Sequence, residues 1–117
     1  MYRFEITDDL GRTLSYPLTG TGVVLIGRND TNNIVLPEKS VSRNHCRLLL
    51  NGESIQIEDL GSANGVMVRG VRIQRPTPVT LGDEVIIGEN RFFLREGAKG
   101  LDVTQPFIHL PPDAENE

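Results

Sequence analysis

The chain has 117 residues, which is the length of one compact domain. Twelve Gly and seven Pro indicate many turns and disfavour an all-helical bundle. The net charge of −4 argues against a general nucleic-acid binder, because such proteins neutralise backbone phosphates with a surplus of basic residues.

Short apolar runs, each closed by a turn signal, predict strands along most of the chain. Residues 2–6 and 54–58 alternate between apolar and polar and predict half-buried strands. The continuous apolar runs at 23–26, 48–50 and 85–87 favour core strands over short buried helices, because they are short and β-branched. In chain order, the predicted strands include residues 2–6, 23–26, 34–36, 48–50, 55–57, 66–69 and 85–87.

Turn signals separate these strands at short intervals. Asn51-Gly52 lies between two apolar runs and predicts a type I′ hairpin. No long stretch has helical spacing without a Gly or Pro inside it. We therefore expect roughly nine to eleven short strands between residues 2 and 95, arranged as an all-β antiparallel sandwich.

The strand pattern stops at about residue 97. Residues 97–117 contain three Pro and hold one Lys against four acidic residues, which predicts a flexible acidic tail or linker. The predicted organisation is one folded domain over residues 1–96 followed by this tail. A further interpretation is that the tail tethers the domain to another domain of a longer protein.

The sequence also predicts a compartment. Cys46 is the only cysteine, so no internal disulfide can form, and a free thiol favours a reducing environment. The N-terminus lacks the regions of a signal peptide, and no apolar stretch approaches the length of a membrane helix. We therefore expect a cytoplasmic protein without a membrane partner.

Polar groups gather in three segments between the predicted strands. A Gly-Arg pair occupies residues 27–28, a Ser-Arg-Asn-His motif occupies residues 42–45, and Asp-Leu-Gly-Ser-Ala-Asn-Gly occupies residues 59–65. If the segments converge, their guanidinium, hydroxyl and amide groups can surround an anion. A phosphorylated side chain carries about −1.5 to −2 charges and three acceptor oxygens at pH 7, so such a site would distinguish it from an unmodified hydroxyl.

The order Gly-Arg, Ser-x-x-His and Asn-Gly resembles the signature of the forkhead-associated (FHA) domain, and the resemblance extends over about residues 2–96. It implies a sandwich of about eleven strands, of the SMAD-FHA type, that binds phosphothreonine peptides and has no catalytic activity or cofactor. The implied partner is a protein phosphorylated by an upstream Ser/Thr kinase, in signal transduction.

The resemblance also implies which residues contact the phosphopeptide. Arg28 would contact the phosphopeptide, Ser42 would give its hydroxyl to the phosphate, and Arg43 would add a charged contact. Asn64 would bind the peptide main chain next to the phosphothreonine, and Ser62 is a further candidate binding residue of the same loop.

Three other residues would support these loops. His45 would form hydrogen bonds that hold the Ser-Arg-Asn-His loop, Gly65 would allow a tight turn, and Gly27 would pack at a strand end. Two positions depart from the usual family pattern, in which Ser or Thr precedes the Asn and Thr follows the Gly: here they are Ala63 and Val66. Ala63 lacks the hydroxyl that the family pattern offers to the phosphate at this position, which predicts a lower affinity.

Other functions have less support in the residues. Cys46 follows His45, but neighbouring strand residues point to opposite faces, so the two cannot easily act as nucleophile and base. Two His and one Cys make no zinc site, and no Gly-x-x-x-x-Gly-Lys phosphate loop is present. We therefore expect neither an enzyme nor a metal protein. The alternative of a different class is a phosphate-independent protein–protein scaffold with a vestigial pocket.

The tail contains a candidate modification site. Thr104 precedes Phe107 by three residues in an acidic stretch, a layout that resembles the ligands of FHA domains. If phosphorylated, Thr104 could dock in its own pocket or in that of a neighbouring copy. The simpler interpretation is an unmodified linker threonine.

Overall fold

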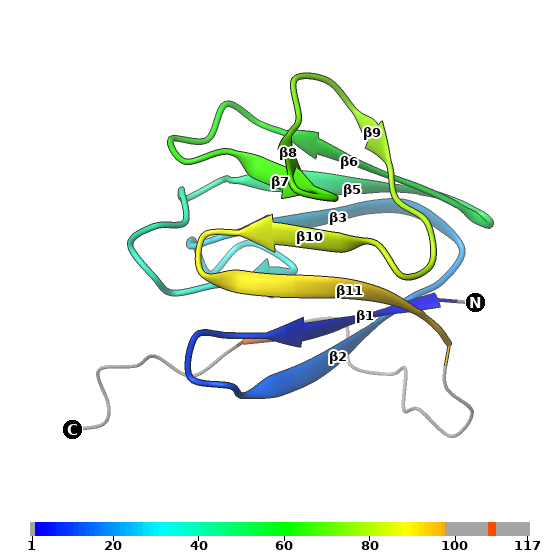
Figure 1. Ribbon diagram of the computed structural model, residues 1–117, viewed down its shortest axis with the longest axis horizontal. Helices are drawn as coiled ribbons and strands as arrows, with labels where there is room; N and C mark the ends of the chain where they lie inside the picture. The colour runs from blue at the N-terminus through cyan, green and yellow to red at the C-terminus, as the bar shows by residue number, and fades with distance from the viewer. Residues whose placement is uncertain (1, 98–107, 110–117) are drawn as a thin grey trace.

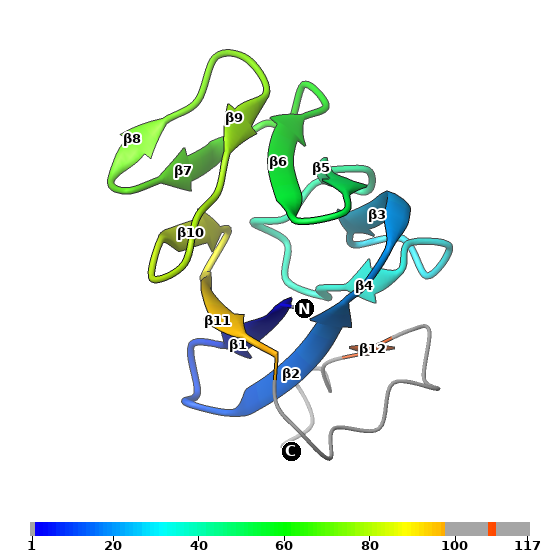
Figure 2. The same ribbon diagram turned by 90° about the vertical axis from the view of Figure 1, so that its right-hand side faces the viewer.

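The computed structural model describes residues 2–97 and 108–109 and contains two six-stranded sheets, which Figure 2 shows as facing layers. The first sheet has, in spatial order, β2 (Thr13–Leu18), β1 (Tyr2–Thr7), β11 (Asn90–Glu96), β10 (Glu84–Ile87), β7 (Val66–Val68) and β8 (Val71–Arg72). The second has β12 (Ile108–His109), β4 (Ile34–Val35), β3 (Thr21–Gly27), β5 (Cys46–Asn51), β6 (Ser54–Asp59) and β9 (Thr77–Pro78). The predicted β-sandwich is confirmed. No helix in the described part of the chain could cross a membrane.

The pairing is antiparallel except at β4, which pairs in parallel with both β3 and β12. β6 also runs in the direction of β3, because each pairs antiparallel with β5. The segments that follow β3, β4 and β6 therefore emerge at the same end of the sheet. Figure 1 shows these loops at the left end of the sandwich.

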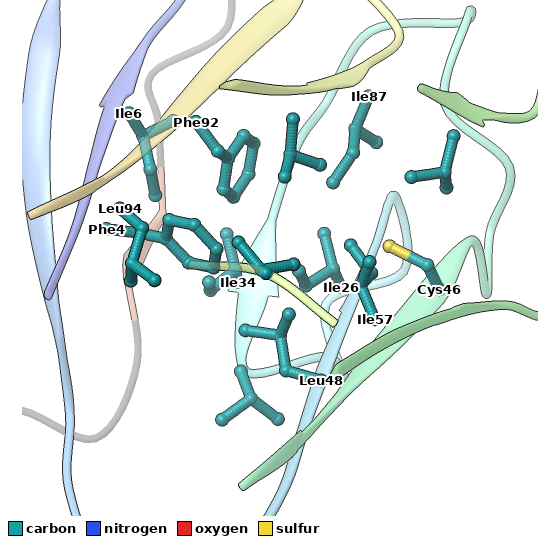
Figure 3. Packing of buried hydrophobic residues seen from close by; sticks show 14 of the residues in the cluster. Phe4, Ile6, Ile26, Ile34, Cys46, Leu48, Ile57, Ile87, Phe92 and Leu94 are labelled. Atoms are coloured by element: carbon teal, nitrogen blue, oxygen red, sulfur yellow. The ribbon is translucent and has the colours of Figure 1, made fainter. Parts of the chain in front are cut away.

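The alternating pattern of the first predicted strand places its apolar side chains between the sheets. Phe4 and Ile6 of β1 are fully buried, as is Phe92 of β11. The Phe4 and Phe92 rings meet edge to face with their centroids 5.4 Å apart, an arrangement favoured by the aromatic quadrupole. Figure 3 shows this cluster continuing to Cys46 at the other side of the core.

The continuous apolar run of β3 is a strand, but only one of its faces is covered. Val24 and Ile26 are buried, whereas Val23 is 50% exposed and Leu25 is 38% exposed. The run therefore belongs to a sheet with one open face, although continuous apolar runs are typical of strands buried on both faces.

The hairpin at Asn51-Gly52 is confirmed, with a different turn. Asn51 pairs within the β5–β6 ladder, so the two loop residues are Gly52 and Glu53. Only the first of them has positive φ (66°), which is the pattern of a type II′ turn. Positive φ at both loop residues, as type I′ requires, occurs instead at Arg69 (54°) and Gly70 (84°), between β7 and β8.

Part of the predicted tail takes part in the second sheet, since β12 pairs with β4. Thr104 and Phe107 lie outside the described residues. The boundary at residues 96–97 stays a prediction.

Candidate functional site

The three polar segments of the sequence meet at one end of the sandwich. The Arg28 main-chain N–H donates to the Ser42 carbonyl at 3.0 Å, and the Asn29 N–H donates to the Arg43 carbonyl at 3.2 Å. These bonds join the β3–β4 loop to the β4–β5 loop. The β6–β7 loop joins them through the Ala63 N–H, which donates to Ser42 Oγ at 3.0 Å. We call the site formed by these three loops the rim.

Ser42 belongs to the rim, and its hydroxyl hydrogen is donated to no residue that the structure describes. A serine hydroxyl offers one donor and two acceptor positions. The Ala63 N–H occupies one acceptor position, so it holds the oxygen in place without using the hydrogen. Ala63 has no hydroxyl of its own, but its main chain fixes the orientation of Ser42.

The two predicted arginines are both exposed at the rim. Arg28 Nε donates to the Val41 carbonyl at 2.9 Å, which anchors the guanidinium. Its terminal nitrogens make no hydrogen bond or ion pair within the described part of the chain. The Arg43 side chain has no hydrogen bond or ion pair with any residue that the structure describes. Its charge is therefore available to an anion bound beside Ser42.

Asn64 is also placed at the rim with half of its amide group available. Asn64 Nδ2 donates to the Ser40 carbonyl at 2.9 Å, across 24 positions in the sequence. This bond sets the direction of the exposed side chain and leaves its amide oxygen to accept a hydrogen bond from a peptide N–H.

Ser62 belongs to the same loop but is oriented inwards. It is 8% exposed, and its Oγ accepts a hydrogen bond from the Gly65 N–H at 2.9 Å. Its own N–H donates to Asp59 Oδ1 at 3.0 Å. The Ser62 hydroxyl thus closes the turn that presents Asn64, whereas the binding role expected from the sequence needs an accessible hydroxyl.

His45 connects two of the loops from beneath. The ring is fully buried; Nδ1 accepts a hydrogen bond from the Ser42 N–H at 2.9 Å, and Nε2 lies 2.8 Å from the Gly65 carbonyl oxygen. Because Nδ1 accepts, the neutral ring carries its hydrogen on Nε2 and donates it to that carbonyl. Both ring nitrogens are therefore used for support.

Gly27 allows the close contact between β3 and the β4–β5 loop. A Cβ at this position would overlap the Arg43 carbonyl oxygen and lie 2.8 Å from Asn32 Nδ2. Asn32 is 2% exposed and donates to the carbonyls of Asn29 and Arg43, at 2.8 and 2.9 Å. Asn32 was not predicted from the sequence, because nothing in the spacing distinguishes it from the other polar residues of its loop.

Asn90 is a second residue that supports the loops and was not predicted from the sequence. Asn90 is fully buried, and its Nδ2 donates to Glu38 Oε1 at 2.9 Å, which joins the start of β11 to the β4–β5 loop. The two residues are 52 positions apart, so no local pattern could have indicated this contact.

The sequence profile of the FHA domain matches residues 24–88, which is more than half of the chain. The chain belongs to the FHA domain family. This FHA domain is 38% identical to FhaB of Mycobacterium tuberculosis over 72 residues, which are 62% of this chain and 46% of FhaB. The chain thus spans about half the length of this relative.

Solved structures of FHA domains share the fold. The FHA domain of the CT664 protein from Chlamydia trachomatis superposes with a TM-score of 0.77 and 27% identity, over 83% of this chain and 98% of that one. Mycobacterium tuberculosis EmbR, in complex with a low-affinity phosphopeptide, superposes with a TM-score of 0.70 and 34% identity, over 84% of this chain and 26% of EmbR.

FHA domains are non-catalytic interaction modules, and the cysteine of this one is not placed for catalysis. Cys46 is fully buried; burial raises the pKa of its thiol, and the charge of Asp59 raises it further. The thiol therefore stays protonated at neutral pH, although the thiolate is the reactive form. Within residues 2–97 and 108–109, no group of three or more His, Cys, Asp or Glu could hold a metal ion.

Proposed function

We propose that this FHA domain is a non-catalytic module that recognises phosphothreonine peptides in Ser/Thr kinase-dependent signalling. One observation carries the proposal: Arg28, Ser42, Arg43 and Asn64, from three separate loops, stand at one rim with unused donors and acceptors. A phosphate dianion needs several fixed donors, and an arginine fork beside a serine hydroxyl supplies them.

The proposed roles follow from the groups that remain available. Arg28 and Arg43 bind phosphate oxygens, Ser42 donates its hydroxyl hydrogen, and the Asn64 amide oxygen accepts a main-chain N–H of the peptide. Ser62 joins His45, Gly27 and Gly65 as a support of the loops. The phosphopeptide in the EmbR complex supports the ligand class.

The partner is a protein that an upstream Ser/Thr kinase phosphorylates on threonine. We propose that the protein acts in the cytoplasm. The proposed role of the tail is to tether the domain to a further domain. Docking of phosphorylated Thr104 stays a prediction, which mass spectrometry of the protein from its native cell can test.

Binding should depend on the phosphate and on Arg43. We expect a phosphothreonine peptide to bind, its unmodified form to bind at least about 100-fold more weakly, and Arg43→Ala to weaken binding about 10- to 100-fold, since a hydrogen bond to a charged group contributes about 1.5–3 kcal/mol. Isothermal titration with matched phosphothreonine, phosphoserine and unmodified peptides measures this. Equal binding of all three would instead favour the phosphate-independent scaffold.

Affinity should also fall as the pH falls. The second pKa of the phosphate is near 6, so the dianion dominates at pH 7 and the monoanion at pH 5. Protonation removes a charge and an acceptor, and we expect about tenfold weaker binding at pH 5. Thermal melts at both pH values control for the integrity of the domain. An affinity that stays flat from pH 7 to pH 5 would argue against a dianionic ligand.

A further inference from the structure

Apart from the rim, a hollow lies between β7, β8 and β9 and has no assigned role. Its volume is about 540 Å³, and Arg69, Arg72 and Arg75 line it. Among the residues that the structure describes, no Asp or Glu lines this hollow. It is therefore a cationic site in a chain whose net charge is −4.

The other part of the lining is apolar. Val68 and Ile73 are buried, while Val71 is 66% exposed, the largest exposed fraction among the large hydrophobic residues described. Arginine around an exposed aliphatic side chain is a combination typical of interfaces, where Arg is enriched and apolar area becomes covered.

Two of the three arginines have charges that remain available. Arg69 is occupied by Asp83 and also donates to the Pro78 carbonyl at 3.4 Å. The exposed side chains of Arg72 and Arg75 make no hydrogen bond or ion pair with residues 2–97 or 108–109. These two guanidinium groups can bind an added anion without breaking a contact described in the fold.

An adjoining hollow of about 350 Å³ shares Arg72 and Arg75 and is also lined by Glu58 and Asp59. Both carboxylates already have partners. Glu58 accepts a hydrogen bond from Arg47 at 2.7 Å, and Asp59 accepts one from the Ser62 N–H at 3.0 Å. Because two carboxylates line the smaller hollow and no described Asp or Glu lines the larger one, the larger hollow is the better place for an anionic ligand.

Arg72 connects this hollow to the rim. Its guanidinium lies against the Gly65 main chain, so closely that a Cβ on Gly65 would overlap Arg72 Nε and lie 2.7 Å from Cζ. Gly65 directly follows Asn64, which is proposed to hold the peptide main chain. A peptide held by Asn64 would therefore reach Arg72 if its chain extended from Asn64 toward Gly65.

We infer that the hollow binds an acidic stretch of the same phosphoprotein, with an aliphatic side chain on Val71 and carboxylates or a second phosphate on Arg72 and Arg75. This inference rests on the proposed function and adds a second anionic subsite to the peptide that the rim selects. Charge complementarity favours an acidic peptide, and the apolar lining favours a peptide over a nucleic acid.

Affinity measurements on a peptide series test the inference. A phosphothreonine peptide with neutral flanks is compared with versions in which a Glu-Leu-Glu block occupies successive positions on either side of the phosphothreonine. We expect the peptide with the block at one of these positions to bind about tenfold more tightly than the peptide with neutral flanks. Two ion pairs and one covered side chain each add a modest contribution to the binding free energy. A second phosphothreonine in place of the block tests whether phosphate replaces carboxylate.

Matched variants locate the gain. The double variant Arg72→Gln/Arg75→Gln should remove the gain in affinity from the acidic block. Arg75→Gln alone leaves the contact between Arg72 and Gly65 intact, so it should reduce this gain while the affinity for the neutral peptide stays unchanged. Arg91→Gln/Arg95→Gln removes the same charge from β11 and should leave the gain unchanged. The inference would be overturned if no placement increased the affinity, or if the Arg91/Arg95 variant lost the increase to the same extent. It would also be overturned if single-stranded DNA bound to Arg72 and Arg75 more tightly than the acidic peptide does.

Failure of the proposed function has a different signature. In that case the neutral phosphothreonine peptide does not bind, and Arg43→Ala changes nothing. The hollow is then tested separately. An unphosphorylated hexapeptide that contains the Glu-Leu-Glu block is titrated, and the Nε–Hε NMR signals of the arginines are followed. Shifts of the Arg72 and Arg75 signals would support the acidic-peptide site, and their absence would exclude it.

Discussion

Replacing His45 by alanine is expected to lower the free energy of unfolding by about 3–5 kcal/mol and to abolish phosphopeptide binding. The buried ring accepts a hydrogen bond from the Ser42 N–H and donates one to the Gly65 carbonyl. Alanine leaves both groups without a partner, at a cost of about 1–3 kcal/mol each, and leaves a cavity. Binding fails because the contacts position Ser42 and the turn after Asn64.

Chemical denaturation and peptide titration measure the two effects separately. Asn44→Ala is the matched control, because Asn44 is an exposed neighbour in the same loop. Its free energy of unfolding should stay within about 0.5 kcal/mol of the unmodified protein. A His45→Ala protein that keeps its stability to within about 1 kcal/mol, or its affinity, would contradict the role assigned to the ring.

Gly27→Ala should destabilise the domain by about 2–4 kcal/mol and weaken phosphopeptide binding more than tenfold. Gly27 does not have positive φ, so its backbone conformation suits alanine. The cost comes from space: the added Cβ would overlap the Arg43 carbonyl oxygen, which is main chain and cannot rotate away. The β4–β5 loop must move, and it carries Ser42 and Arg43.

Gly61→Ala separates this contact from backbone strain. Gly61 has a φ of 81°, and a Cβ added there would meet no other atom within 4 Å, so alanine causes strain without a clash. We expect it to cost about 1 kcal/mol and to change affinity little. If Gly27→Ala behaves like Gly61→Ala in denaturation and titration, the close approach of β3 to the loop is not what positions the rim.

Most of the strand pattern could be predicted because its signals are local. Alternation in β1 placed Phe4 and Ile6 inside, and they are fully buried. The exposed face of β3 could not be predicted, because every residue in its apolar run is hydrophobic. The pattern therefore does not indicate which face of the strand is open to solvent. The exposure of Val23 and Leu25 depends on where the opposite sheet lies.

The candidate site was predictable in composition and less so in orientation. The motifs placed Arg28, Ser42, Arg43 and Asn64 in loops, and the fold brings these loops together. The Ser-x-x-His motif singled out Ser42, but no local signal shows whether the hydroxyl of Ser62, another polar loop residue, is accessible or buried. Its inward direction follows from the hydrogen bond with Gly65 in the folded turn.

The sequence by itself determined the β-rich fold class, the approximate positions of several strands and the identity of the groups that can bind an anion, because these depend on neighbouring residues. Only the tertiary structure decided which polar groups bond to one another and which stay available. The Ala63–Ser42 contact spans 21 positions and the Asn90–Glu38 contact spans 52. Such partners are chosen by how strands pair and sheets pack, and local spacing carries no record of that choice.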